Sequence, residues 1–237
     1  MSSALEEPAG AVTTAGVPGR PLRRAVSEAD KASRRTDILS AAKQVFAERG
    51  YHATTIADIA RQAGLSYGSI YWYYESKEAL FHELVSAEAS ALRAHINGAV
   101  RTASTDEGPA APLQAAVRAT LEFYEADSAF VRLLFRDAFA LGCGFEEHLS
   151  AIHASFVDDA ERLVLLAQRQ GELVQGSSKM MAFAITALVG QLAHRRLTTD
   201  DELSAGEAAS FAAELLLNGL RPRGRRDPSQ VRGTPPA

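Results

Sequence analysis

The chain has 237 residues, 46% of them hydrophobic and 23% charged, which is typical of a folded protein with one large domain or two smaller ones. Its single cysteine, Cys143, excludes an internal disulfide, and no Cys/His cluster resembles a zinc site, so we expect a reducing, cytoplasmic setting with no metal or other cofactor. The N-terminus lacks the pattern of a signal peptide, and the longest charge-free apolar segment, Met180 to Ala193, is too short for a membrane span. We expect no membrane association.

Charge is distributed unevenly along the chain, although the formal net charge is only -4. Residues 20–50 carry eight basic and four acidic side chains, whereas residues 81–220 carry ten basic and nineteen acidic ones. An acidic body with a basic edge favours a polyanionic partner at one end of the molecule. The alternative is a charged helix that is simply solvated.

The predicted elements begin after a flexible arm, residues 1–30, which is rich in Gly, Pro, Ala and Ser. Apolar residues then recur at i, i+3, i+4, i+7 and i+8 from Ile38 to Phe46, which predicts an amphipathic helix ending near Gly50. Thr55 and Asp58 have the spacing of a capping box at the start of a second, shorter helix.

A tight turn follows, because Gly64 supplies a left-handed residue that ends the second helix. Ser66 caps a third helix that runs to about Tyr73, and we expect Ile70, Tyr71 and Tyr74 to face inward. The sequence thus places two short helices across a glycine turn, which is the pattern of a helix-turn-helix unit whose second helix can enter the DNA major groove.

The rest of the sequence predicts further helices. A long fourth helix begins near Ser76, residues 102–112 form a break with Gly108, Pro109 and Pro112, and residues 222–237 form a flexible tail. Between them we expect helices over residues 113–126, 128–141, 145–170, 178–196 and 207–220. No alternating strand pattern appears, so the expected fold is all-α.

The segment from Ile38 to Leu84 resembles the TetR-like family of bacterial transcriptional regulators. The likeness is carried by Ile38-Leu-x-Ala-Ala-x-x-x-Phe-Ala-x-x-Gly50-Tyr51, Thr54-Thr-Ile-x-x-Ile-Ala60 and Ala63-Gly-Leu-Ser-Tyr-Gly-Ser-Ile-Tyr71, then Tyr74, Lys77 and Leu80. It implies a three-helix DNA-binding domain over residues 31–78 and a larger helical domain for effector binding and dimerisation over residues 79–221.

The resemblance also implies which side chains meet operator DNA. Residues at the start of the third helix would face the groove, neighbouring rings would touch sugar, phosphate or thymine methyl groups, and Lys77 would meet a phosphate. Basic residues before the first helix would add contacts that do not depend on sequence. The candidate DNA-binding residues are Arg34, Arg35, Thr54, Thr55, Ser66, Tyr67, Gly68, Ser69, Tyr71, Trp72, Tyr73 and Lys77.

Each of these residues also has a structural interpretation. A tyrosine in so short a helix can be a packing residue, with Tyr71 and Tyr74 partly in the small core, and Thr55 can be a plain N-cap. Arg34 and Arg35 can be merely solvated. Gly68 is informative because glycine weakens a helix by about 1 kcal/mol relative to alanine, so close approach to a partner would explain it.

In the C-terminal half the family resemblance implies an effector pocket and a dimer interface. The candidate pocket residues are Phe123, Tyr124, Phe130, Phe135, Phe139, Phe156 and Met181, which favour a hydrophobic or aromatic effector, although such rings can equally be core. The segments Ser178 to Arg196 and Glu207 to Leu220 would pair with their copies in a four-helix bundle. A monomer could bury the same faces.

We therefore predict a dimeric repressor that a small hydrophobic or aromatic effector releases from its operator. One alternative is a constitutive DNA-binding factor with no effector. The other is an enzyme, which the sequence does not favour because it holds no nucleophile elbow, phosphate loop or metal motif.

Overall fold

The computed structural model describes residues 28–103, 110–128, 131, 133, 143–198 and 204–220, and these residues form helices and connecting turns without a strand. The N-terminal helices are α1 (Glu28–Arg49), α2 (Ile56–Gln62) and α3 (Tyr67–Ile70). The longer helices that follow are α4 (Lys77–Thr102), α5 (Ala111–Ala126), α7 (Cys143–Arg169), α8 (Ser178–Thr198) and α9 (Ala205–Leu220). The all-α prediction is confirmed.

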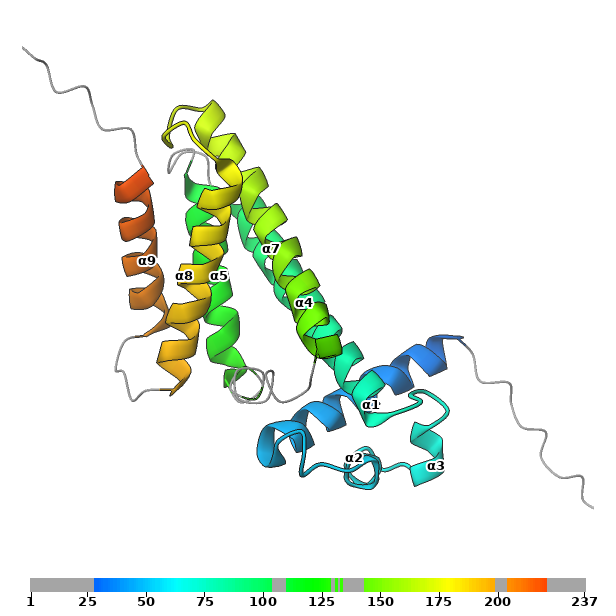
Figure 1. Cartoon of the computed structure of the whole chain (residues 1–237). Helices are drawn as coiled ribbons and strands as arrows, with labels where there is room; N and C mark the ends of the chain where they lie inside the picture. Colours follow the sequence, from blue (N-terminus) through cyan, green and yellow to red (C-terminus); the bar gives the residue numbers. More distant parts are fainter. Residues whose placement is uncertain are drawn as a thin grey trace, which may run out of the picture.

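Two packed units are visible in Figure 1, with α1, α2 and α3 at one end and a bundle of long helices at the other. The helix α4 runs from the first unit into the second, where α5 and α7 lie beside it. The helix α8 packs against α7 and α5, and α9 lies at the outer edge against α5 and α8. Because α4 belongs to both units, a displacement of its distal part can be transmitted to the small N-terminal domain.

The N-terminal core confirms the predicted amphipathic pattern of the first helix. Ile38, Ala42, Val45 and Phe46 of α1 pack with Ile59 of α2 and other apolar side chains. This core also takes in Leu80, Phe81, Leu84 and Val85 from α4, together with Leu133 and Phe145. It therefore extends beyond residue 78, which was the predicted end of the DNA-binding domain, and α1 begins at Glu28 rather than at residue 31.

A second core lies within the bundle and joins α5, α7, α8 and α9. Its largest buried contributions include Leu121, Val164, Ile185 and Val189, with small alanines of α9 packed against them. A capping box starts α9, because Ser204 Oγ accepts from the Glu207 backbone N–H (3.2 Å) and Glu207 accepts from the Ser204 N–H (2.8 Å). Within the described ranges, no helix has both the length and the hydropathy that a bilayer span requires.

Candidate DNA interface and effector cavity

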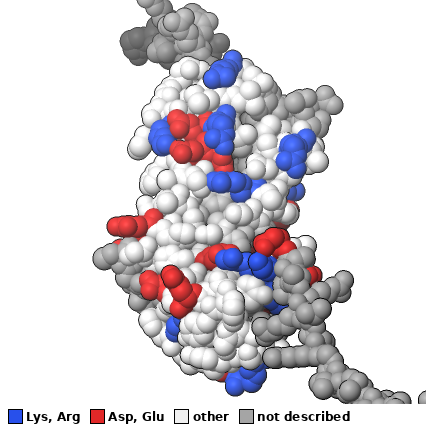
Figure 2. Space-filling view, turned by 90° about the vertical axis from the view of Figure 1, so that its right-hand side faces the viewer, with Lys and Arg blue, Asp and Glu red and all other residues white. Residues whose placement is uncertain are grey.

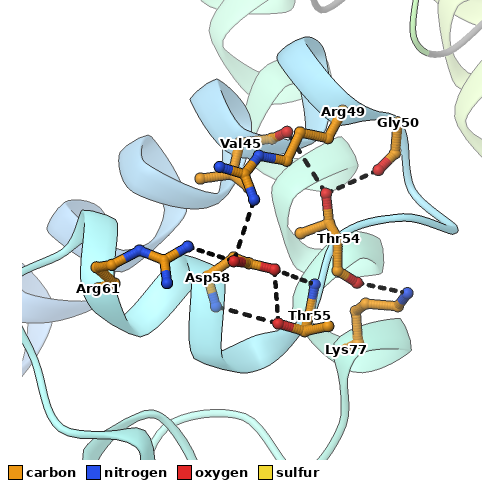
Figure 3. Close-up of polar contacts among 8 residues, drawn as sticks. All are labelled: Val45, Arg49, Gly50, Thr54, Thr55, Asp58, Arg61 and Lys77. Carbon is orange, nitrogen blue, oxygen red and sulfur yellow. Dashed lines mark hydrogen bonds and ion pairs between the residues drawn. The ribbon is translucent and has the colours of Figure 1, made fainter.

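The first turn of α2 is fixed by a reciprocal capping box, as its sequence predicted (Figure 3). Thr55 Oγ1 accepts a hydrogen bond from the Asp58 backbone N–H (3.2 Å), and Asp58 Oδ2 accepts one from the Thr55 N–H (3.1 Å). Arg49 and Arg61 both contact the same carboxylate. The hydrogen bond from the Thr55 hydroxyl is the largest influence on Asp58 and, with these other contacts, lowers its pKa to about 2.

The turn between α2 and α3 depends on Gly64, whose φ of 64° lies in the left-handed region that favours glycine. Ser66 then caps α3, with its hydroxyl accepting from the Ser69 backbone N–H at 3.2 Å. Ile70 is fully buried and anchors α3 to the N-terminal core. The start of α3 is therefore held rigidly while its outer side faces solvent.

Packing within this chain does not explain why position 68 is a glycine. A Cβ atom added there meets nothing within 4 Å among the described residues. The missing side chain therefore leaves open space on the solvent side of α3, as expected where another molecule approaches the helix backbone closely.

Aromatic side chains dominate the exposed surface around α3. Trp72 is 87% exposed and Tyr67 is 54% exposed, although large apolar rings are usually covered in a folded protein. Tyr71 is also 44% exposed, so its expected place in the small core is wrong, whereas Tyr74 is buried as predicted. The last turn of α3 explains the difference: Tyr71 stacks edge-on against Tyr67, and their hydroxyl oxygens are 3.0 Å apart.

We use the name α3 tip for the exposed surface that these residues form. It comprises the exposed residues Ser66, Tyr67, Gly68, Tyr71 and Trp72 together with Ser69, which is half-buried. Tyr73 lies beside it but is only partly exposed and packs against the N-terminal core. The α3 tip thus offers hydroxyl groups, rings and an open backbone on one convex end of the molecule.

Thr54 and Lys77 have internal partners instead (Figure 3). Thr54 is 1% exposed, and its hydroxyl donates to the Gly50 carbonyl oxygen at 2.7 Å. The Lys77 ammonium donates to the carbonyl oxygens of Tyr51 (2.8 Å) and Thr54 (2.9 Å) and lies over the Tyr51 ring, and burial lowers its pKa. Lys77 therefore fastens the start of α4 to the turn that precedes α2.

The two candidate arginines of α1 differ in their surroundings. Arg35 forms an ion pair with Glu83 of α4 (Nη2–Oε2 3.1 Å) and lies over the Tyr74 ring, so its charge is directed into the fold. Arg34 is half exposed and has a long 3.7 Å contact with Asp37 one turn away. Of the two, Arg34 is better placed to reach an external phosphate.

Charged side chains of both signs are interspersed on the face shown in Figure 2, with uncharged surface between them. Part of the basic surplus of residues 20–50 is accounted for by local pairing, since Lys31, Lys43 and Arg49 each contact a carboxylate. The residues before Glu28, including Arg20, Arg23 and Arg24, lie outside the described part of the chain.

A cavity of about 650 Å³ lies in the helical bundle, between α4, α5, α7 and α8. Three of the predicted pocket residues, Phe123, Tyr124 and Phe156, line it. Met181 does not, because it packs in the second core, where its sulfur lies 3.5 Å from Gln168 Nε2. The predicted residues Phe130, Phe135 and Phe139 lie outside the described residues.

The cavity also contains polar residues that sequence reasoning did not find. They include Arg93, Asp159 and Arg162 on one side and Glu88 and Asp127 nearer to the N-terminal domain. These side chains come from three helices that are far apart in sequence, so no local spacing signals that they converge.

Large apolar side chains are exposed on α8 and on α9, and one of them, Phe183, also lines the cavity. Met180 and Phe183 of α8 are 66% and 51% exposed, and Phe211 and Leu215 of α9 are 57% and 52% exposed. All four lie within the two segments that the sequence assigned to a dimer bundle. Exposed apolar patches of this kind mark surfaces at which proteins associate.

The N-terminal geometry defines a helix-turn-helix DNA-binding domain, here joined to a helical domain that contains the cavity. Residues 38–84 match the family model described as bacterial regulatory proteins, tetR family. The HTH-type transcriptional activator FasR of Mycolicibacterium smegmatis is 28% identical over 187 residues, which cover 79% of this chain and 83% of FasR. The HTH-type transcriptional repressor KstR2 of Rhodococcus jostii is 47% identical over 55 residues, which cover 23% of this chain and 27% of KstR2.

The fold is also shared with a solved structure, that of the fatty acid degradation regulator FadR from Bacillus halodurans. It superposes with a TM-score of 0.70 at 20% identity and covers 78% of this chain and 99% of FadR. Over residues 38–84 the chain is therefore similar to the bacterial regulatory proteins of the tetR family, and its fold as a whole is shared with a solved bacterial regulator.

Proposed function

We propose that this protein is a dimeric transcriptional repressor that binds operator DNA through the α3 tip and leaves it when a small hydrophobic or aromatic effector fills the cavity. The observation that carries the proposal is the exposure of Tyr67, Tyr71 and Trp72 on a rigidly capped helix. A solvent-facing ring cluster has no role in packing this chain, whereas tyrosine hydroxyls and ring edges can meet sugar, phosphate and base edges in a groove.

The proposed DNA contacts follow from the placement of each candidate. Ser66, Tyr67, Gly68, Ser69, Tyr71 and Trp72 form the contact surface, with Tyr73 at its border. Arg34 supplies a phosphate contact from its exposed position, whereas the Thr55 hydroxyl and backbone N–H are engaged with Asp58 in the capping box. We assign Thr54, Arg35 and Lys77 to holding this surface in place, because each has its polar group engaged within the protein.

Dimerisation is supported by the exposed apolar side chains of α8 and α9. Pairing these helices with their copies would remove Met180, Phe211 and Leu215 from water, which is favourable by roughly 25 cal/mol per Å² of apolar surface. A two-fold dimer also carries two α3 tips, and such pairs bind half-sites spaced by about one helical turn of DNA.

Regulation by an effector is supported by the position of the cavity. Its lining includes α4 from Val85 to Val100, and the same helix begins in the N-terminal core. An effector that binds one position of α4 better than the other changes the population of DNA-competent dimers. Among the relatives, KstR2 is named a repressor and FasR an activator, and we propose repression for this chain.

The test is a fluorescence-anisotropy titration in which the purified full-length protein is added to a labelled DNA duplex taken from the region upstream of its own gene. We expect saturable binding with an affinity that falls steeply with salt, and weaker binding after cavity ligands are added. A panel of hydrophobic compounds is then tested for effects on DNA affinity and on Tm. If no compound changes either quantity, the result would instead support a constitutive factor without an effector. Absence of binding to any genomic fragment would overturn the proposal.

A further inference from the structure

The ring of Phe183 on α8 borders both the cavity and the solvent. Phe183 lines the cavity between α4, α5, α7 and α8, and it is nevertheless 51% exposed. Large aromatic side chains are usually covered in a folded protein, because their burial is favourable. A side chain that lines a cavity and is also exposed to solvent lies where that cavity reaches the surface.

His153 of α7 lies opposite Phe183 at the same place. It is also exposed, and it also lines the cavity. The two rings meet edge-on between α7 and α8, with their centroids 6.0 Å apart and their planes at 85°. We use the name cavity mouth for the opening that His153 and Phe183 border.

The side of the cavity between α4 and α7 is closed by charged groups instead. Arg93 of α4 and Asp159 of α7 both line the cavity and form an ion pair (Nε–Oδ2 2.7 Å), and Arg162 contacts the same carboxylate. The Arg93 guanidinium lies over the Phe156 ring, 5.4 Å from its centroid. Opening this side therefore separates a partly buried ion pair and uncovers an apolar ring, which are both unfavourable.

Opening the cavity mouth requires only the motion of a side chain. The Phe183 side chain carries no hydrogen-bonding group, so its rotation leaves no polar group of its own unpaired. Exposed side chains change rotamer within picoseconds to nanoseconds. The nearby lining residues of α8 include Ala187 and Gly190, and a Cβ atom added at Gly190 meets nothing within 4 Å. The wall of α8 beside the ring is therefore made of small residues that leave space for it to turn.

We propose that Phe183 is a side-chain gate of the cavity. Held against His153, as in this structure, its ring covers the cavity mouth; turned away, it admits small apolar molecules between α7 and α8. The inference rests on the proposed function in one respect, since it names the route by which an effector reaches its site. It also explains why a large ring stays half exposed on the surface of the bundle.

The test measures how fast an uncharged thiol reagent, dithiodipyridine, reaches a cysteine inside the cavity of the full-length protein. Cys143→Ser removes the single native thiol, and Val117→Cys supplies one at a lining position that is only 3% exposed. In this background Phe183→Ala should raise the labelling rate about two- to tenfold, which is the factor that the loss of one aromatic pair corresponds to. His153→Ala should act in the same direction, so it keeps the test decisive if Phe183→Ala unfolds.

Two controls separate a gate from a general loosening of the bundle. Met180→Ala removes another exposed apolar side chain of α8, one turn before Phe183, that does not line the cavity, and it should leave the labelling rate unchanged. Val164→Cys, used in place of Val117→Cys, puts the thiol at a fully buried position of the second core outside the cavity lining. Phe183→Ala should not accelerate labelling there.

The gate is overturned if neither Phe183→Ala nor His153→Ala accelerates labelling at position 117. It is also overturned if positions 117 and 164 are accelerated equally, because the substitution then destabilises the bundle as a whole. Sedimentation of each variant gives its oligomeric state. A gain in labelling that Met180→Ala reproduces, and that accompanies dissociation of a dimer, would make Phe183 an interface residue rather than a gate.

The inference and the proposed function fail in different ways, because the labelling test needs no effector. If labelling responds as expected but no hydrophobic compound changes DNA affinity, the gate stands and the effector role fails. If a compound releases the DNA while labelling is unaltered by Phe183→Ala and His153→Ala, the regulatory function stands and the gate is wrong.

Discussion

Lys43 of α1 forms an ion pair with Glu88 of α4, and the distance between Lys43 Nζ and Glu88 Oε1 is 2.8 Å. The same ammonium contacts Asp127 after α5. Both carboxylates line the cavity, whereas Lys43 belongs to the first helix of the DNA-binding domain. A ligand that displaces α4 or α5 therefore changes a direct polar contact with that domain.

We expect Lys43→Met to weaken the coupling between effector and DNA. The side chain of Lys43 is 24% exposed, so its loss leaves two partly buried carboxylates facing each other without their cation. The coupling free energy, measured from DNA affinity with and without effector, should fall by about 0.5–2 kcal/mol.

Lys31→Met is the matched control. Lys31 lies on the same helix, and among the described residues its ion pair is with the exposed Glu28. It should leave the coupling unchanged, as expected for a surface pair. Equal coupling in the Lys43→Met variant and the wild type would show that the contact does not transmit the signal.

Lys77→Met should destabilise the N-terminal domain without changing the salt dependence of DNA binding. The substitution leaves the carbonyl groups of Tyr51 and Thr54 without their cationic donor, and we expect a loss of about 1–3 kcal/mol. Urea unfolding gives the stability. The slope of the logarithm of the DNA association constant against that of salt concentration reports phosphate contacts.

Arg34→Ala should have the opposite effects to Lys77→Met on stability and on the salt dependence of DNA binding. Its exposed guanidinium has a weak intrahelical contact, so stability should change little while the salt slope falls by about one. A drop of the same size in the slope for Lys77→Met would restore the phosphate role that the sequence predicted for that lysine.

Tyr67→Phe should alter sequence preference rather than overall affinity. It removes the hydroxyl that meets the Tyr71 hydroxyl at 3.0 Å, so the surface loses one hydrogen-bonding group while the ring remains. Discrimination at one operator base pair should fall by about 1–3 kcal/mol, as measured on a library of single-substituted operators. An unchanged preference at every position would show that this hydroxyl reads no base.

Tyr74→Phe should stabilise the protein slightly and leave DNA binding unchanged. The Tyr74 hydroxyl is buried near the Arg35 guanidinium, but within the described residues it makes no hydrogen bond of normal geometry. Removing an unsatisfied buried hydroxyl is expected to raise the free energy of unfolding by about 1 kcal/mol. A clear loss of stability would show that the hydroxyl has a partner in the folded protein, for example an ordered water.

The Asp58 capping box should make stability pH-dependent at low pH. The folded-state pKa of Asp58, about 2, lies below its ordinary value of 3.8, so the charged carboxylate stabilises the fold at neutral pH and this contribution is lost as the pH falls toward 2. The difference in unfolding free energy between wild type and Asp58→Asn should therefore shrink as the pH is lowered.

Asp37→Asn is the control for this series, because Asp37 is an exposed residue of α1 with one long contact to Arg34. Its difference from the wild type should vary less with pH. A difference for Asp58→Asn that stays constant from neutral pH to about pH 3 would contradict the role of the charged cap.

The sequence by itself determined most of the local structure of this protein. The capping box at Thr55, the left-handed Gly64 and most of the described helices follow from residues within a few positions of one another, whereas the third helix, expected to run to about Tyr73, ends at Ile70. Most of the expected helix over residues 128–141 lies outside the described residues. Such signals are readable because a helix turn or cap is completed by its own neighbours. The resemblance over residues 38–84 then indicated the helix-turn-helix domain.

Tertiary structure decided which side chains are available for function. Lys77 turns toward the Tyr51 and Thr54 carbonyls rather than outward, and Tyr71 turns outward rather than into the core. Likewise, Arg93 meets Asp159 from another helix, and Lys43 meets Glu88 across the junction of the two units. The partners in these contacts are brought together by packing of whole helices, which a periodicity of three or four residues does not encode.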